Sequence, residues 1–175
     1  MMKTLMATIL AVGGAFAHAD LLLEPYVGYH TGDLKRPGFD ADFNGTTIGA
    51  RIGYQQLGAM VGVDYFTGMW DDDANPSGDD TPSVFGIFAG YNFPVLLRAY
   101  AGYNFMTDLK REAGGGSTKY EGSSIKLGVQ TTILPFVAVG LEYWTAEFDE
   151  ADGNSLSPEL EGKGIGLIVS LPMTF

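Results

Sequence analysis

A five-residue sequence, Ala-Gly-Tyr-Asn-Phe, occurs twice within the stretch from Ser83 to Met106, first at residues 89–93 and again at residues 101–105. The five residues between the copies, 94–98, leave room only for a tight reversal. Alternate residues of an extended segment lie on one face, and in both segments one face is wholly apolar while the other is small and polar. The apolar face comprises Phe85, Ile87, Ala89, Tyr91, Phe93, Leu97, Ala99, Ala101, Tyr103 and Phe105. This stretch therefore predicts a long β-hairpin.

The same alternation continues along the chain and predicts eight strands. They cover residues 21–31, 46–56, 59–69, 83–93, 97–106, 123–133, 136–147 and 162–175. Long loops are expected at residues 33–43, 70–82, 107–121 and 148–161, with tight turns in between. An even number of strands of about eleven residues, joined alternately by long and short connections, predicts an all-β, eight-stranded antiparallel up-and-down barrel. About ten tilted residues also match the apolar thickness of a bilayer, so the barrel is expected to be transmembrane.

The N-terminal segment has the features of a signal peptide. Lys3 supplies a positive charge, residues 5–16 are apolar, and residues 17–19 read Ala-His-Ala before Asp20. This pattern predicts a cleaved signal peptide at residues 1–19 and an exported barrel domain at residues 20–175. The sequence has no cysteine, so no disulfide can stabilise the exported domain.

The formal net charge of −11 comes mainly from three of the expected loops. Residues 70–82 and 148–161 contain acids and no base, and residues 33–43 add further net negative charge. A nucleic acid partner would require clustered Lys and Arg, so the sequence argues against one. No cofactor is expected.

Alternation alone does not distinguish a membrane barrel from a soluble lipocalin-like barrel, because the two have opposite faces outward. The polar face here is mostly glycine, which suits a crowded lumen better than a water-exposed surface. The same face also carries three acids and three bases, and bases at the middle of a membrane would cost about 2–4 kcal/mol each if they faced lipid. We therefore expect a charge network inside the lumen, formed by Glu24, Arg51, Asp64, Arg98, Lys126 and Glu142.

Aromatic residues gather toward the strand ends on the apolar face, as the interfacial girdles of a membrane barrel require. The expected membrane-interface aromatics are Tyr54, Tyr65, Tyr91, Phe93, Tyr103, Phe105, Tyr143 and Phe175.

These features together resemble the small eight-stranded outer-membrane barrels, the group that includes the transmembrane domain of outer membrane protein A and the opacity-type and adhesin-like surface proteins. The last strand, with Leu171, Met173 and Phe175 in phase, is similar to the C-terminal signal of that group. The resemblance implies a Gram-negative outer membrane, lipopolysaccharide as a neighbouring lipid, extracellular long loops, and recognition of the C-terminal strand by the barrel assembly machinery. We also expect the barrel to be a monomer.

The sequence contains two candidate chemical sites. Asp71, Asp73, Asn75 and Asp79 could supply oxygen ligands to calcium. However, Pro76 stands where an EF-hand loop needs its glycine, and no bidentate glutamate follows at the right distance, so a solvated acidic loop is favoured. Some barrels of this group modify lipid A with Ser, His and an acid. His30, with Ser83, Ser123 or Ser124, is the only such candidate outside the signal peptide, yet its phase places it in the lumen, away from lipid.

The sequence therefore predicts a non-enzymatic outer-membrane barrel with a structural or surface-interaction role and a lumen plugged by paired charges. A narrow pore for small solutes, a lipid A-modifying enzyme and a soluble ligand-binding barrel remain as alternatives. If the lumen charges are paired, Arg98→Ala should destabilise the protein more than any change of a loop charge.

Overall fold

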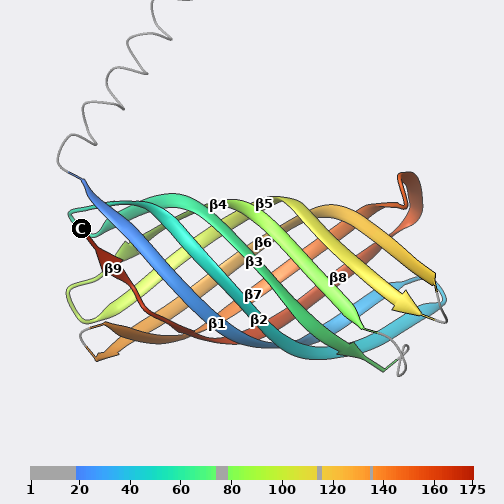
Figure 1. The fold of residues 1–175 in the computed structure, drawn as a ribbon, viewed down its shortest axis with the longest axis horizontal. Helices are drawn as coiled ribbons and strands as arrows, with labels where there is room; N and C mark the ends of the chain where they lie inside the picture. Colours follow the sequence, from blue (N-terminus) through green and yellow to red (C-terminus); the bar gives the residue numbers. More distant parts are fainter. Residues whose placement is uncertain (1–18, 74–78, 114–115, 135) are drawn as a thin grey trace, which may run out of the picture.

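A computed structural model describes residues 19–73, 79–113, 116–134 and 136–175. The chain forms a single antiparallel ring of strands, which confirms the predicted barrel (Figure 1). The strands are β1 (Asp20–Arg36), β2 (Phe39–Gln56), β3 (Ala59–Asp72), β4 (Asp80–Asn92), β5 (Leu97–Ala113), β6 (Gly116–Leu134), β7 (Val137–Ala151), β8 (Asn154–Ser170) and the short β9 (Met173–Thr174).

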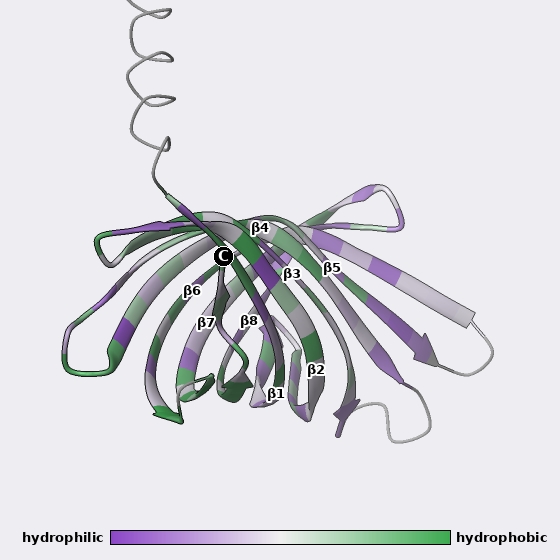
Figure 2. Cartoon of the chain, turned by 60° about the vertical axis from the view of Figure 1, so that its left-hand side comes forward, coloured by the Kyte–Doolittle hydropathy of each residue, from purple (hydrophilic) through white to green (hydrophobic). Residues whose placement is uncertain are grey.

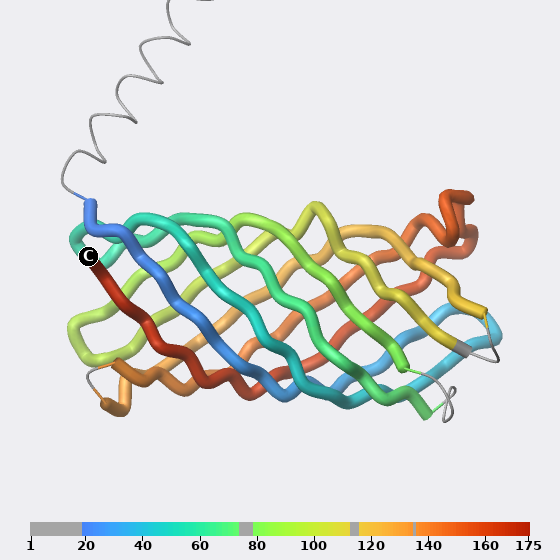
Figure 3. The backbone as a smooth tube through the Cα atoms, in the orientation of Figure 1, coloured from blue at the N-terminus to red at the C-terminus, as the bar shows by residue number. Residues whose placement is uncertain are grey.

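From β1 to β8, consecutive strands pair with each other, and β1 pairs with both β2 and β8 to close the ring; the short β9 pairs with β1. The strands are strongly tilted to the long axis, as the backbone tube shows (Figure 3). The C-terminus and the start of β1 lie at the same end, together with the connections β2–β3, β4–β5 and β6–β7 (Figure 1). We call this end the terminal end and the opposite one the distal end. Within the described residues, no helix has the length and hydropathy to span a bilayer.

The strands extend much further at the distal end than the sequence predicted. The segment 33–43, expected to be a loop, is strand on both sides of a turn at Pro37 and Gly38. Segment 148–161 likewise reverses at Asp152 and Gly153, and most of 107–121 belongs to β5 and β6. In the expected loop 70–82, β3 continues to Asp72 and β4 begins at Asp80. These loop predictions were wrong because most of the polar residues there occupy outward positions of continuing strands, while apolar residues such as Phe43 and Phe148 occupy inward ones.

The prediction of one continuous final strand was also wrong. It was expected to run without interruption over residues 162–175, but β8 ends at Ser170 and β9 follows after Leu171 and Pro172. Proline has no N–H to donate to a ladder, so the break falls where pairing is lost. The chain then rejoins β1, and Phe175 and Leu21 exchange backbone hydrogen bonds of 2.9 and 3.0 Å.

The polarity of the barrel wall inverts along the strands, although side chains keep their inward and outward alternation throughout. Figure 2 shows hydrophobic and hydrophilic residues following one another along the strands. In the terminal half of β2, Ile48, Ile52 and Tyr54 face outward and are exposed, while Arg51 faces inward and is buried. In its distal half, Asp40 and Asp42 face outward and Phe43 is buried inside. The terminal half thus has an apolar outer wall, whereas the distal half has a polar outer wall around an apolar core.

The distal core fills the barrel interior at that end. Its buried members are Leu34, Phe43, Trp70, Leu109, Trp144, Ala146, Phe148 and Leu160. The rings of Phe43 and Trp70 stack at 4.4 Å, and Trp70 stacks on Trp144 at 5.5 Å. A smaller apolar cluster of Leu22, Met60, Phe88 and Tyr100 lies toward the terminal end. The interior is therefore packed on both sides of the charged residues between these clusters.

Candidate functional site

The structure brings the six charged residues expected in the lumen into one connected network. All six are buried, with exposed fractions from 0% for Glu24 to 7% for Arg98. They come from different strands: Glu24 on β1, Arg51 on β2, Asp64 on β3, Arg98 on β5, Lys126 on β6 and Glu142 on β7. The alternation of each strand points its charged residue inward, so the ring closure alone gathers them.

Arg51 is the centre of this lumen network. Its Nη1 lies 3.3 Å from Glu24 Oε1 and its Nε 3.2 Å from Asp64 Oδ2, and its Nη2 pairs with Glu142. Its guanidinium lies between two tyrosine rings, 4.5 Å from the centroid of Tyr26 and 4.2 Å from that of Tyr100. A planar guanidinium suits this arrangement, because its edge can serve several carboxylates while its faces stack on rings.

The other two bases complete the pairing. Lys126 pairs with Asp64 and lies 3.8 Å from Glu142. Arg98 lies nearer the terminal end, where its Nη1 is 2.5 Å from Glu24 Oε2 and its Nε donates to Asn92 Oδ1 at 2.6 Å. Three acids thus meet three bases, and burial of each charge is offset by an oppositely charged partner.

Two tyrosines belong to the network although the sequence analysis did not select them. The hydroxyl of Tyr26 donates to Asp64 at 2.8 Å, and that of Tyr100 donates to Glu142 at 2.6 Å. Both have the inward phase of the charged residues, and that shared phase is the signal that could have identified them. Gly128 makes room for Tyr100, because a Cβ at this position would come within 2.1 Å of the tyrosine ring.

His30 lies between the lumen network and the distal core. It is 2% exposed, stacks on Phe66 at 6.2 Å and has no hydrogen-bond partner at Nδ1. Of the three candidate serines, Ser124 is also in the lumen, where it binds Asn104 and Thr107, whereas Ser83 and Ser123 are half-buried on the other face of the wall. The arrangement thus does not assemble a serine, a histidine and an acid at a surface that a lipid could reach.

A cavity of about 20 Å³ lies beside His30. Among the residues lining it, His30, Trp70, Asn104 and Trp144 each carry a buried polar atom without a hydrogen-bond partner in the protein. A cavity of this volume accommodates about one water molecule, and polar atoms of this kind are what such a water binds. The volume is far below the roughly 300–1,000 Å³ of ligand pockets.

The residues considered for calcium do not converge. Asp71, Asp73 and Asp79 are exposed, and Asn75 lies outside the described residues. The buried acids of this region are instead Asp72 and Asp80, which share the guanidinium of Arg111. Burial lowers the pKa of Arg111, but its hydrogen bonds and ion pairs with Asp80 and Asp72 outweigh that effect and raise it. In the described ranges, no group of three or more His, Cys, Asp or Glu is arranged to hold a metal ion.

The eight expected interface aromatics all point outward, with exposed fractions between 42% for Tyr91 and 72% for Phe175. Tyr54, Tyr91, Phe93 and Phe175 lie near the terminal end, and the other four lie where the apolar wall meets the polar distal wall. Tyr29, not selected from the sequence, joins the second group; its hydroxyl donates to Asn44 at 3.0 Å.

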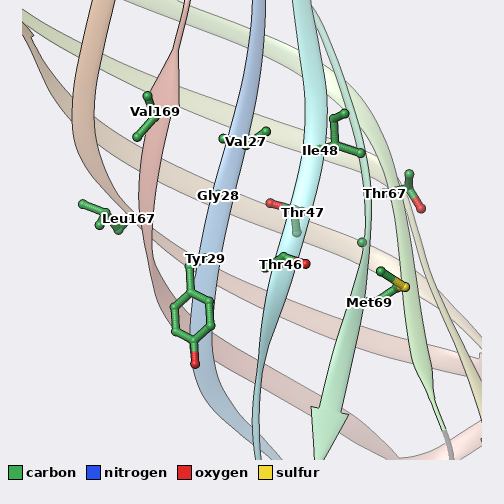
Figure 4. A pocket seen from close by; sticks show the side chains of 11 residues that line it. Val27, Gly28, Tyr29, Thr46, Thr47, Ile48, Thr67, Met69, Leu167 and Val169 are labelled. Carbon is green, nitrogen blue, oxygen red and sulfur yellow. The ribbon is translucent and has the colours of Figure 1, made fainter.

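A groove of about 720 Å³ lies on the outer wall across β8, β1, β2 and β3 (Figure 4). Val27, Tyr29, Ile48 and Leu167 project around it, and no charged side chain lines it. Such a lining suits acyl chains and offers no histidine, carboxylate or amine for acid–base chemistry.

The comparisons with known proteins agree with this geometry. The model of the outer membrane protein beta-barrel domain family matches residues 4–171. Neisserial surface protein A has a similar structure, with a TM-score of 0.60 and 16% identity over 85% of this chain and 96% of that one. The attachment invasion locus protein of Yersinia pestis, solved with the heparin analogue sucrose octasulfate, gives a TM-score of 0.59 and 11% identity over 87% and 99%.

At these identities the two structures are similar to this chain in fold. No curated protein matches it in sequence. The family and its structural neighbours place the protein in the bacterial outer membrane. The match over residues 4–171 shows that the chain belongs to the outer membrane protein beta-barrel domain family.

Proposed function

We propose that this protein is a non-enzymatic, monomeric barrel whose lumen is closed to solutes and which acts through the outer surface of its distal half. The observation that carries the proposal is the layered filling of the lumen. Solutes entering from the terminal end would meet Arg98 and Glu24, then Arg51 with Asp64 and Glu142, and then the stacked Trp70 and Trp144 of the distal core. An eight-stranded barrel is narrow enough for side chains to fill its interior.

Insertion of the purified barrel into planar bilayers tests the closed lumen. We expect no steady conductance, with a known porin as the positive control for insertion. Two variants probe the layers separately: Trp70→Ala opens part of the distal core, and Arg51→Ser opens the lumen network. Each single variant should show no steady conductance, because the other layer still fills the lumen. Large, steady channels from the unmodified protein would contradict the proposal.

The orientation belongs to the same proposal. The start of β1, the C-terminus and the tight turns lie at the terminal end, which we place on the periplasmic side, so the distal half projects outside the cell. The Phe175 end of the chain, held beside Leu21, would then be accessible to the barrel assembly machinery. Lipopolysaccharide would surround the junction where the polar distal wall begins. Strands β1 to β8 are each paired on both sides, so the ring offers no unpaired strand edge to a second copy of the protein.

The distal wall supplies the interaction surface, and its chemistry favours a cationic partner. A groove of about 520 Å³ on the outside of β5 to β8 is lined by Asp108, Glu121, Glu147, Asp149, Glu150 and Glu159, with Lys119 as its one basic residue. Opposite charges steer association and strengthen as salt is reduced. A sulfated ligand, of the kind bound by the Yersinia protein, would be repelled by this wall.

The preference for a cationic partner can be tested with the barrel held in lipid nanodiscs. The measurement is the retention of these nanodiscs on a polylysine surface and on a heparin surface. We expect salt-sensitive binding to polylysine alone, weakened by the triple variant Glu147→Gln, Asp149→Asn, Glu159→Gln. A matched control, Asp40→Asn, Asp42→Asn, Asp71→Asn, removes equal charge from the other side of the barrel and should weaken binding less. Equal losses would show an effect of net charge only, and binding to heparin would contradict a cationic partner.

A further inference from the structure

The tight turns at the terminal end are apolar at their tips, where a water-exposed turn would carry polar residues. Leu57 is 91% exposed in the β2–β3 connection, Val95 and Leu96 are 75% and 65% exposed in the β4–β5 connection, and Phe136 is 60% exposed beside β7. Segments 55–59, 92–97 and 131–138 contain no Asp, Glu, Lys or Arg. Exposed apolar side chains gathered in this way mark a contact surface.

The backbone makes this choice of residues more unusual. Leu57 has φ of +51° and Leu96 has φ of +59°, both in the left-handed region. Bulky residues rarely adopt that conformation, which Gly, Asn and Asp accept at lower cost. Two turns therefore place a leucine where the backbone favours a small or polar residue, and the only contact these exposed side chains can gain is with something outside the chain.

The length of the apolar outer wall indicates what that contact is. On β2 the outward residues are apolar over 48–54, and on β7 over 137–143, before Thr46 and Thr145 begin the polar wall. A tilted strand needs roughly 9–11 residues to cross the apolar layer of a membrane. The apolar stretch of β2 reaches that length only when Leu57, in the turn after it, is counted. Phe136, directly before β7, and Leu134, at the end of the neighbouring β6, extend the apolar wall in the same direction.

Charged groups close to the turns do not oppose burial in lipid. Arg98 follows the β4–β5 turn but points into the lumen, where it pairs with Glu24. Asp20 has the inward phase of Leu22 and Glu24 and lies across the ladder from Gln55, so it faces the lumen side of the rim. Between the apolar outer wall and the turn tips, the outward positions hold only uncharged residues, such as Gln56 and Thr131.

We infer that the turns of the terminal end are inserted into the lipid leaflet on that side, as a direct continuation of the lipid-facing wall. The partner of this surface is lipid, and the barrel rim lies within the membrane interface. The distal half, by contrast, projects far beyond the other leaflet. The protein is consequently positioned off-centre across the bilayer.

Site-directed spin labelling tests the inference on the full barrel in phosphatidylcholine vesicles. The sequence contains no cysteine, so Leu57→Cys and Leu96→Cys can each be labelled at a single site. We expect both labels to collide preferentially with oxygen, which concentrates in acyl chains, and to lose collisions with a water-soluble nickel chelate relative to a label at Glu112→Cys on the distal wall. Nickel collisions at both turn sites equal to those at Glu112→Cys would overturn the inference, and would leave the turns available to a periplasmic protein.

A second measurement does not depend on labelling. Leu57→Asn and Leu96→Asn together retain a residue that accepts the left-handed backbone while removing the apolar tips. We expect this variant to lower the urea midpoint of unfolding in vesicles and to leave the midpoint in detergent micelles, which adapt to the barrel rim, nearly unchanged. Equal changes in both environments would mean that the leucines act within the fold and would overturn the inference.

Discussion

Arg51 and Glu24 lie directly opposite each other in the β1–β2 ladder, and a 3.3 Å ion pair joins their side chains inside the barrel. Arg51 is also opposite Asp64 on the next strand, so three charges of alternating sign occupy one row across three strands. Each of these three charges is buried, and each is stabilised by the oppositely charged side chain beside it.

Replacing Arg51 with Met should destabilise the barrel by about 3–5 kcal/mol, since three buried carboxylates lose a common cation. The measurement is the urea midpoint of unfolding in lipid vesicles, followed by tryptophan fluorescence. Arg98→Ala should cost less, because Glu24 keeps Arg51 as a partner.

The control for both is Lys110→Ala, which removes an exposed base whose partner Glu112 is also exposed. Surface changes of this kind stay within about 0.5 kcal/mol. Midpoints that coincide for Arg51→Met, Arg98→Ala and Lys110→Ala would show that the lumen network contributes nothing to stability.

Gly128→Ala should lower stability by about 1–3 kcal/mol through overpacking, because the new methyl group would collide with Tyr100 and displace its hydroxyl from Glu142. Gly162→Ala is the matched control: its Cβ would come no closer than 3.1 Å to Leu34 and 3.3 Å to Trp144. Comparison of the two unfolding midpoints checks the prediction, and a larger loss for Gly162→Ala would contradict it.

Phe43→Ala should remove the ring that stacks on Trp70 and cost about 3–5 kcal/mol, as truncation of a buried aromatic residue does. The loss should appear first as faster hydrogen exchange in the distal strands, with the lumen network still protected. Ile48→Ala changes a residue on the same strand that is 63% exposed toward lipid, and the distal amides should not respond to it.

The pKa of Lys119 should be higher than that of an ordinary lysine, because hydrogen bonds to Glu121 and Asp108 raise it. Its folded-state pKa exceeds the unfolded value, so its contribution to stability is complete below about pH 10.4 and is lost as the pH rises through the folded value. NMR titration of its Nζ checks the direction. The variant Asp108→Asn, Glu121→Gln should lower this pKa, and an unchanged titration would contradict the assigned cause.

The interior charges could be located from the sequence because strand phase is enough to place them. Arg51 and Asp64 share the phase of inward glycines. The interior of an eight-stranded barrel is narrow, so side chains that point inward lie close together. Which acid binds which base was beyond the sequence, since pairing depends on the stagger between strands. The ring register decides, for example, that Lys126 reaches Asp64 from the far side of the lumen.

The distal half was missed for a physical reason. Segments such as 39–44 keep the alternation of a strand, with Phe39, Ala41 and Phe43 between Asp40, Asp42 and Asn44. Outside the membrane an outward position prefers charge and an inward one prefers an apolar residue, which is the reverse of the rule inside it. An apolar outward face was expected along the whole strand, so these segments were interpreted as polar loops, and the shared role of Arg111 between Asp72 and Asp80 went unrecognised.

The reversal of wall polarity also constrains how the protein is assembled. A closed distal half would have to carry its outward carboxylates and ammonium groups through the acyl layer as a finished cylinder, which hydrocarbon strongly opposes. With the distal half outside the cell, as proposed above, we therefore expect its hairpins to cross before that half closes, and its aromatic core to form after they have crossed. The stacking of Trp70 on Trp144 would then report that the distal half has closed.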